Sequence, residues 1–231
     1  MKTPKWRFSF GEKMNLEKYT DTSYREFNRK LVPGVENILG IRVPILRKIV
    51  KEMNEDEKKL FLNSLPHKYH EENIMHMIII SEENDYNKAK EMLSEFLPFV
   101  DNWQVCDVGI PKVFKKLEDG EDLLLFVKKL ISNEATFFKR YGIFILMKIY
   151  LDDYYNREIL EMVAEINSEE YYVNMMRAWF FQEAMVKRYD DAIKYLENKK
   201  LDKFTHLKTI SKCVDSRKID EKTKQYLKTL R

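Results

Sequence analysis

The most informative stretch of the chain is Val100-Asp101-Asn102-Trp103-Gln104-Val105-Cys106-Asp107, which continues into Val108-Gly109-Ile110-Pro111. Asp101 and Asn102 are residue types that cap helix N-termini, so a helix is predicted to begin here. Trp103 and Asp107 lie four residues apart and therefore share one face of that helix.

An acid beside an indole allows two interpretations. In the first, Trp103 packs inward and Asp107 pairs with a Lys or Arg, because an acid is rarely placed near a core without a partner. In the second, Asp107 is a catalytic carboxylate. Pro111 has no N–H to donate to the carbonyl of Asp107, which predicts a kink in a helix over residues 101–116.

The composition predicts an all-α protein. The 231 residues are 44% hydrophobic and 34% charged, which is ordinary for a soluble globular or helical-repeat chain. Only 6 Gly and 6 Pro are present, too few for the many turns of a β-sandwich or barrel. The net charge of +3 is small, so nucleic-acid binding would require basic residues gathered on one face.

Neither the N-terminus nor the apolar runs indicate export or a membrane. The first residues lack the apolar core of a signal peptide, and the longest apolar runs are too short to span a bilayer. Cys106 and Cys213 fit no metal or redox spacing, so each is expected to be a small buried hydrophobe in a reducing compartment. We therefore expect a cytoplasmic protein.

Three histidines lie close together at His67, His70 and His76. The zinc-protease helix needs two histidines at positions i and i+4, and this spacing is absent. Capping and packing are the expected roles, with no metal site.

Hydrophobic periodicity predicts an irregular arm over residues 1–14, followed by helices that come in pairs with short polar joints. The predicted helices span residues 15–31, 43–50, 54–62, 67–81, 84–96, 101–116, 119–131, 133–150, 153–166, 168–188, 190–198, 202–214 and 220–230.

Three of these pairs carry Trp103, Arg140 and Trp179 at corresponding points, 37 and 39 residues apart. A period of about 40 residues built from two helices is typical of HEAT-type solenoids. We therefore predict a single HEAT-like-repeat domain over residues 1–231, folded as a curved right-handed α-α superhelix. Its second helices would line one concave face and make Trp103, Asp107, Arg140 and Trp179 neighbours.

Several local patterns resemble a known family in their order and intervals over about residues 22–231. They are Gly40-Ile41-Arg42-Val43-Pro44 leading into Leu46-Arg47-Lys48, the Trp103-to-Asp107 pair, Lys139-Arg140 before an apolar run, Trp179 in an aromatic helix, and more weakly Lys208-Thr209-Ile210-Ser211-Lys212 with Ser216-Arg217-Lys218-Ile219. The chain resembles the bacterial DNA alkylation repair family, the AlkD-like HEAT-repeat alkylpurine DNA glycosylases.

The resemblance implies an enzyme that excises N3- or N7-alkylated purines from duplex DNA without a cofactor, acting as a monomer. It implies that Trp103, Trp179 and Asp107 form the lesion-side cluster, with Asp107 stabilising the sugar cation, and that Arg140 holds the DNA backbone. The basic residues expected to add backbone contacts are Lys112, Lys115, Lys139, Arg177, Lys208, Lys212 and Arg217.

The chain departs from the family pattern at two points. Only one clear helix, ended by Pro33-Gly34, precedes Gly40, which indicates a branch with a shortened N-terminal region. Gln182 stands where a basic residue is expected after Trp179. The alternative hypothesis is a non-catalytic HEAT-like module that binds DNA or a protein.

Overall fold

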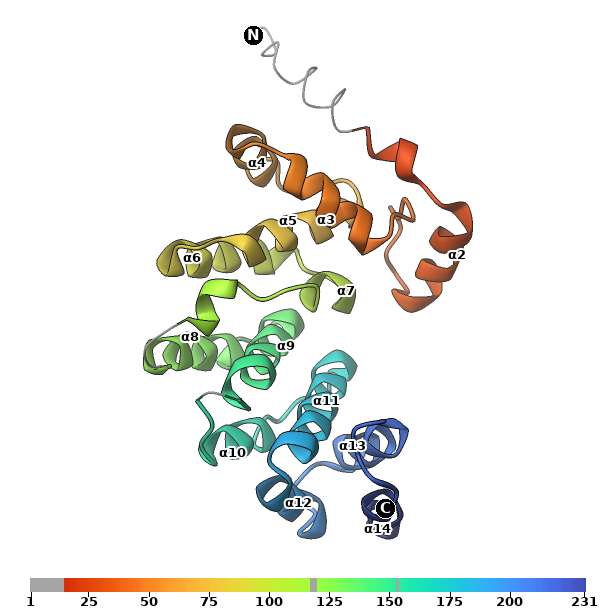
Figure 1. Ribbon diagram of the computed structural model, residues 1–231, viewed down its shortest axis with the longest axis vertical. Helices are drawn as coiled ribbons and strands as arrows, with labels where there is room; N and C mark the ends of the chain where they lie inside the picture. Colours follow the sequence, from red (N-terminus) through yellow and green to blue (C-terminus); the bar gives the residue numbers. More distant parts are fainter. Residues whose placement is uncertain (1–14, 117–119, 153) are drawn as a thin grey trace, which may run out of the picture. The chain divides into compact units, whose positions relative to one another are not determined.

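The computed structural model describes residues 15–116, 120–152 and 154–231, and the predicted irregular arm over residues 1–14 lies outside them. Every regular element in these ranges is helical, so the predicted all-α class is confirmed (Figure 1). The chain divides into two compact units, Met1–Lys112 and Val113–Arg231, each described by itself below. That the repeats form one continuous domain stays a prediction.

The first unit is built from short helices. They are η1 (Leu16–Tyr19), α2 (Thr22–Leu31), α3 (Val43–Glu52), α4 (Glu55–Leu62), α5 (His70–Glu82), α6 (Tyr86–Phe96), η2 (Leu97–Phe99) and α7 (Trp103–Cys106). Side-chain caps define several of their starts. Asn54 accepts from the Glu57 N–H while the Glu57 carboxylate accepts from the Asn54 N–H, a reciprocal pair that fixes the start of α4.

Helix α5 is the centre of the first unit. Its apolar residues run round most of its circumference, including Ile74, Met75 and Ile78, and all three are buried. A helix that is apolar on all sides must be covered on all sides. Helices α3, α4, α6 and α7 provide that cover (Figure 1).

A buried carboxylate organises the loop before α3. Glu71, in the first turn of α5, accepts hydrogen bonds from the backbone N–H groups of Leu39, Gly40 and Ile41 at 2.9, 2.7 and 3.2 Å. Gly40 has φ +86°, and a Cβ there would lie 2.5 Å from the carbonyl oxygen of Asp21. The loop therefore requires glycine at this position.

The second unit follows the same plan with longer helices. Its elements are η3 (Lys112–Lys115, which starts at the unit boundary), α8 (Glu121–Ser132), α9 (Thr136–Ile145), the π-helical turn η4 (Leu146–Tyr150), α10 (Glu158–Ala164), α11 (Tyr171–Lys187), α12 (Tyr189–Glu197), α13 (Lys203–Asp215) and α14 (Glu221–Thr229).

Helix α11 is the centre of the second unit. It packs against α9, α12 and α13, while α8 packs with α9 and α13 with α14 (Figure 1). Packing of consecutive helices in pairs is the construction of an α solenoid. The predicted helices over residues 168–188 and 202–214 correspond to α11 and α13 to within three residues at each end.

The predicted helix over residues 101–116 is wrong. Helix α7 is a single turn that ends at Cys106, so Pro111 does not kink a helix. After α7, Arg47 donates from Nη2 to the Val108 carbonyl at 2.6 Å. Gly109 then passes so close to α5 that a Cβ would lie 2.7 Å from the Cβ of Ser81.

Candidate nucleic-acid interface and lesion site

Trp103 is tied to the end of α2. Its indole Nε1–H donates to the Leu31 carbonyl at 2.9 Å, and the ring is half-buried. The last carbonyls of a helix have no partner within the helix, so this bond satisfies one of them. The indole is consequently held in one orientation.

A polar network fixes the turn that carries Trp103. The Asn102 side chain caps α7 by accepting from the N–H groups of Gln104 and Val105, as predicted for this N-terminus. The Gln104 amide donates to Asn28 at 2.6 Å, and its oxygen lies 2.9 Å from Nε2 of His70. The sequence analysis missed Gln104, whose role becomes visible only once α2 and α5 are placed beside α7.

Asp107 follows directly as the C-cap of α7. Its backbone N–H donates to the Trp103 carbonyl at 2.9 Å, so the two residues are one helical turn apart, as predicted. The residue is half-buried. Its catalytic role stays a prediction.

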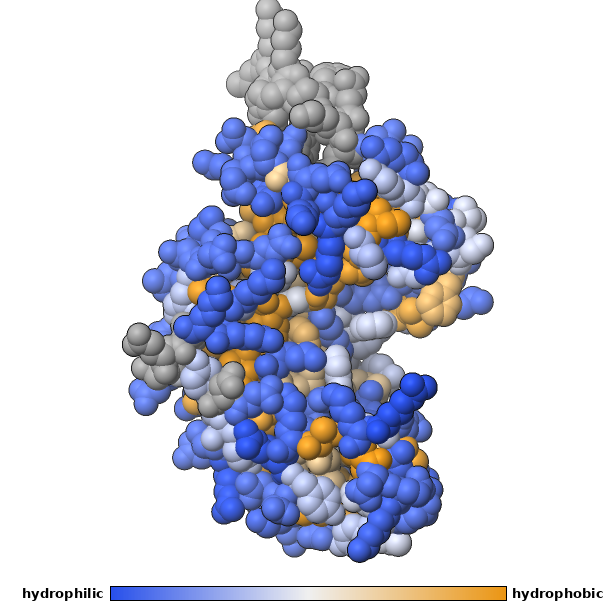
Figure 2. Space-filling model, in the orientation of Figure 1, coloured by the Kyte–Doolittle hydropathy of each residue, from blue (hydrophilic) through white to orange (hydrophobic). Residues whose placement is uncertain are grey.

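Helix α2 also presents apolar side chains to solvent. Phe27 is 56% exposed and Leu31 is 37% exposed, and Figure 2 shows an apolar patch over this helix. The residue whose carbonyl holds Trp103 is thus part of an exposed apolar surface.

Arg140 lies in α9 within a group of cations in the second unit. Its guanidinium donates from Nη1 to the Tyr172 carbonyl at 2.7 Å, and the residue is only 5% exposed. Burial lowers the pKa of Lys212 in α13, and the nearby charges of Arg140 and Lys208 lower it further. The charges of Arg140 and Lys208 therefore both act on the Lys212 ammonium.

The other predicted contacts differ in their surroundings. Lys139 pairs with Glu134 at 3.5 Å and its side chain is 14% exposed. The exposed residues are Lys112, Lys115 and Arg217. Their contact with DNA stays a prediction.

Arg177 is bound inside the second unit. Its side chain is 3% exposed and pairs with Asp202 at 2.6 Å. Its Nε and Nη2 donate to the carbonyls of Val163 and Ala164 at 3.1 and 2.9 Å. These bonds link α10 and α11 to the start of α13, and the expected contact of Arg177 with DNA stays a prediction.

Trp179 is half-buried in α11 next to Phe144, with ring centroids 6.2 Å apart. The ammonium of Lys148 lies 5.2 Å from the indole centroid. The sequence analysis missed Lys148, because its position depends on the π-helical turn η4, which no sequence pattern indicates.

Trp103 and Asp107 belong to the first unit, and Arg140 and Trp179 belong to the second. Each pair is local to its own unit, and the expected convergence of all four stays a prediction.

The histidines are packing residues, as expected. Nε2 of His67 lies 2.8 Å from Nδ1 of His76, and His76 stacks on Phe96 with centroids 3.9 Å apart. Burial lowers the pKa of His67 to about 4 and that of His76 to about 3, where the neighbouring His67 adds to the effect. Within residues 15–116, 120–152 and 154–231, no three His, Cys, Asp or Glu side chains form a group able to hold a metal ion.

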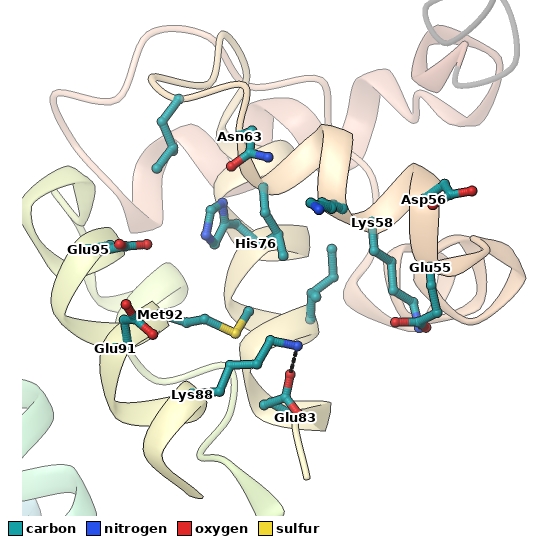
Figure 3. Close-up of a pocket in the computed structure, with 14 residues that line it drawn as sticks. Glu55, Asp56, Lys58, Asn63, His76, Glu83, Lys88, Glu91, Met92 and Glu95 are labelled. Carbon is teal, nitrogen blue, oxygen red and sulfur yellow. Dashed lines mark hydrogen bonds and ion pairs between the residues drawn. The ribbon is translucent and has the colours of Figure 1, made fainter. Parts of the chain in front are cut away.

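A pocket of about 500 Å³ opens on the first unit between α4, α5 and α6 (Figure 3). Lys58 is paired with Glu55, and Lys88 with Glu83, as the dashed line in Figure 3 marks for the second pair. The charged residues that line it are Glu55, Asp56, Lys58, Lys59, Glu83, Lys88, Glu91 and Glu95. Carboxylates outnumber ammonium groups, so the pocket is unsuited to a phosphodiester backbone.

The cysteines and the helix lengths agree with the sequence analysis. Cys106 and Cys213 are buried and outside any disulfide, and burial raises the pKa of the Cys213 thiol to about 12. In the part of the chain that the structure describes, no helix combines the length and the apolar character needed to cross a bilayer.

Comparison with known proteins gives the family. No curated protein matches the sequence. A family model described as "DNA alkylation repair enzyme" matches residues 13–214, which include Trp103, Asp107, Arg140 and Trp179. Because the match covers most of the chain, this protein belongs to the DNA alkylation repair enzyme family.

Proposed function

We propose that this protein is an alkylpurine DNA glycosylase that hydrolyses the N-glycosidic bond of N3- or N7-alkylated purines in duplex DNA. The observation that carries the proposal is the group of Arg140, Lys208 and Lys212, which lies within a chain of the DNA alkylation repair family. Clustered cations on one unit are what a phosphodiester backbone attracts.

Cleavage of the N-glycosidic bond of an alkylated purine needs little catalysis of base departure. A purine alkylated at N3 or N7 carries a positive charge and is already a good leaving group. Bond cleavage leaves an oxocarbenium-like sugar, and the Asp107 carboxylate would supply the opposite charge and orient the attacking water. No metal or cofactor is needed for either step.

The aromatic groups favour cations. An indole face attracts a positive charge by about 0.5–2 kcal/mol, which suits a charged base near Trp103 or Trp179. Arg140, held by the Tyr172 carbonyl, offers a fixed cation for a phosphate. In this proposal the protein acts on duplex DNA as a monomer.

The test is release of free base from a duplex that contains 7-methylguanine. We expect release by the wild type and a loss of roughly 100-fold in single-turnover rate for Asp107→Asn, with the dissociation constant nearly unchanged. Asp101→Asn is the matched control, because it removes a charge from an exposed carboxylate of the same stretch and should retain the rate.

A second variant tests the backbone contact. Arg140→Ala should weaken binding of damaged and undamaged duplexes alike and reduce the salt slope, d log K/d log[salt], by about 1. If the wild type binds DNA tightly and in a salt-dependent way but releases no base, the glycosylase proposal is wrong. The protein would then be a non-catalytic DNA-binding module. If Asp107→Asn releases the base at the wild-type rate, another carboxylate stabilises the sugar cation.

A further inference from the structure

The pocket between α4, α5 and α6 has no part in the proposed chemistry (Figure 3). Its volume of about 500 Å³ lies within the range of sites that hold small organic molecules. All of its lining residues belong to the first unit. The side chains of the lining indicate which class of molecule fits.

Part of the lining is aliphatic. Leu62 of α4, Ile79 of α5 and Met92 of α6 all line the pocket, and Figure 3 shows Met92 extending from α6 toward α5. Such a surface favours contact with hydrocarbon groups over contact with water. A ligand that fits this pocket therefore presents apolar groups.

Two of the three ammonium groups in the lining are already paired. Lys58 pairs with Glu55 at 2.9 Å. Lys88 pairs with Glu83 at 2.6 Å. Lys59 is the remaining ammonium. The positive charges of the pocket are therefore largely neutralised by its own carboxylates.

The unpaired charges of the lining are mainly negative. Asp56, Glu91 and Glu95 are exposed carboxylates, and within the part of the chain that the structure describes none of the three is in an ion pair. Glu91 and Glu95 lie four residues apart on α6, so their carboxylates share one face of that helix. The pocket therefore favours a cation over an anion.

An inorganic cation does not fit this lining. Mg²⁺ and Ca²⁺ are held by several oxygen ligands around one point. Across the described residues, the carboxylates, histidines and cysteines are too scattered to give a group of three for one metal ion. The aliphatic part of the lining also offers nothing to a hydrated ion. The cation that fits is organic.

A buried imidazole adds a hydrogen-bonding atom to the pocket. His76 lines the pocket and is only 3% exposed. Its Nδ1 lies 2.8 Å from Nε2 of His67, whereas its Nε2 has no partner among the described residues. Buried polar atoms in folded proteins nearly always have a partner. When Nδ1–H donates to His67, Nε2 of His76 is an acceptor that an amine N–H can satisfy.

We propose that this pocket binds an aliphatic polyamine. The methylene groups contact the aliphatic side chains, a terminal ammonium lies between Glu91 and Glu95, and an amine N–H donates to Nε2 of His76. Acceptors on three helices, with Asp56 on α4, favour a molecule with several amines over one with a single ammonium. The site uses none of the residues assigned to base release, so this inference does not rest on the proposed function.

The test uses full-length protein without DNA and spermidine as the probe. Imidazole ¹⁵N signals of the labelled protein are followed at pH 7, with His76→Gln identifying the His76 signals. We expect a saturable shift of the His76 Nε2 signal, with a dissociation constant that agrees with calorimetry. If the wild type shows no saturable spermidine binding, or binding that leaves this signal unshifted, the proposal is wrong.

Matched variants separate the pocket from a general attraction between charges. Glu91→Gln combined with Glu95→Gln should weaken spermidine binding by roughly tenfold or more. The control, Glu165→Gln combined with Glu169→Gln, removes the same charge from exposed positions of the second unit and should leave the affinity unchanged. Equal weakening by the two pairs would show that net charge, and not the pocket, attracts spermidine.

A third variant keeps the test available if the pocket pair does not fold. Met92→Lys places an ammonium of the protein inside the pocket and should abolish spermidine binding. Wild-type affinity in Met92→Lys would overturn the proposal.

Two simpler probes test the two parts of the lining. Mg²⁺ carries charge without methylene groups, and n-hexanol carries methylene groups without charge. Neither should displace spermidine from the wild type at equal concentration, and displacement by either one contradicts the polyamine assignment. Release of 7-methylguanine from duplex DNA tests the glycosylase separately, so the failure of one proposal leaves the other standing.

Discussion

At the scale of single residues, the partners of a buried cation decide what it does. Arg140 on α9 and Arg177 on α11 are both nearly buried, and the sequence analysis predicted that both contact DNA. Arg177 is bound by Asp202 and by two backbone carbonyls. A signal for this was present, because Val173, Phe180 and Phe181 lie one turn to either side of Arg177 and mark an apolar face.

This difference predicts the behaviour of Arg177→Met. Loss of the guanidinium leaves the carbonyls of Val163 and Ala164 without donors and Asp202 without its cation. We expect the free energy of unfolding to fall by about 2–4 kcal/mol, discounted because Asp202 is partly exposed. Urea unfolding measures this change, and the salt slope of DNA binding should stay at the wild-type value.

Arg217→Met is the control, since its side chain is exposed. It should change the free energy of unfolding by less than about 0.5 kcal/mol. If Arg177→Met reduces the salt slope of DNA binding and leaves the free energy of unfolding unchanged, Arg177 contacts DNA.

At the scale of elements, long apolar runs predicted helices well, whereas the end of α7 was predicted wrongly. Helix α11 follows from a long, largely apolar run, and α13 follows from an amphipathic run whose start is capped by Asp202. Helix α7 was predicted too long, and the residues that follow it contact Arg47 and Ser81, which are distant in sequence. Local patterns do not contain such contacts.

The loop before α3 gives a second prediction. The Glu71 carboxylate accepts hydrogen bonds from three backbone N–H groups. In Glu71→Gln, the amide NH₂ would face some of these donors and could accept no bond from them. We expect the free energy of unfolding to fall by about 2–3 kcal/mol, because hydrogen bonds to a charged acceptor are lost at a buried site. Thermal or urea unfolding checks this.

The control for this prediction is Glu91→Gln. Glu91 is an exposed carboxylate on α6, and its replacement should leave stability close to the wild-type value. Equal stability for Glu71→Gln and the wild type would show that the loop does not depend on the carboxylate charge.

At the scale of the whole molecule, the class of fold could be predicted from the sequence. Which side chains from different helical pairs lie close together could not be predicted. The period that relates Trp103, Arg140 and Trp179 indicated helical pairs, and pairs are present in both units. Periodicity gives the spacing of equivalent positions along the chain. It does not give rotations between pairs, which depend on side-chain packing at each joint.

The buried His67–His76 pair predicts loss of stability in mild acid. Both pKa values are lowered in the folded protein, to about 4 and about 3, while unfolded histidines titrate near 6.5. Between these values the unfolded chain binds protons that the folded chain does not, so stability falls as pH falls below 6.5. From pH 7 to pH 5 we expect a loss of about 2 kcal/mol, discounted for partial exposure of His67.

Urea unfolding at pH 7, 6 and 5 measures this slope. His76→Gln should be less stable at every pH but should lose less stability between pH 7 and pH 5. An identical slope in the variant and the wild type would assign the acid sensitivity to other groups.

The π-helical turn η4 after α9 makes this part of the chain sensitive to the deletion of a single codon. Leu151 donates to the carbonyl of Leu146, five residues earlier, at 3.2 Å, so this turn holds one residue more than an α-helical turn. The same turn carries Lys148, whose ammonium lies over the Trp179 ring. Loss of a single codon here would restore α-helical spacing and change the register of Lys148 against Trp179. One in-frame deletion, with no substitution at all, would therefore alter this contact.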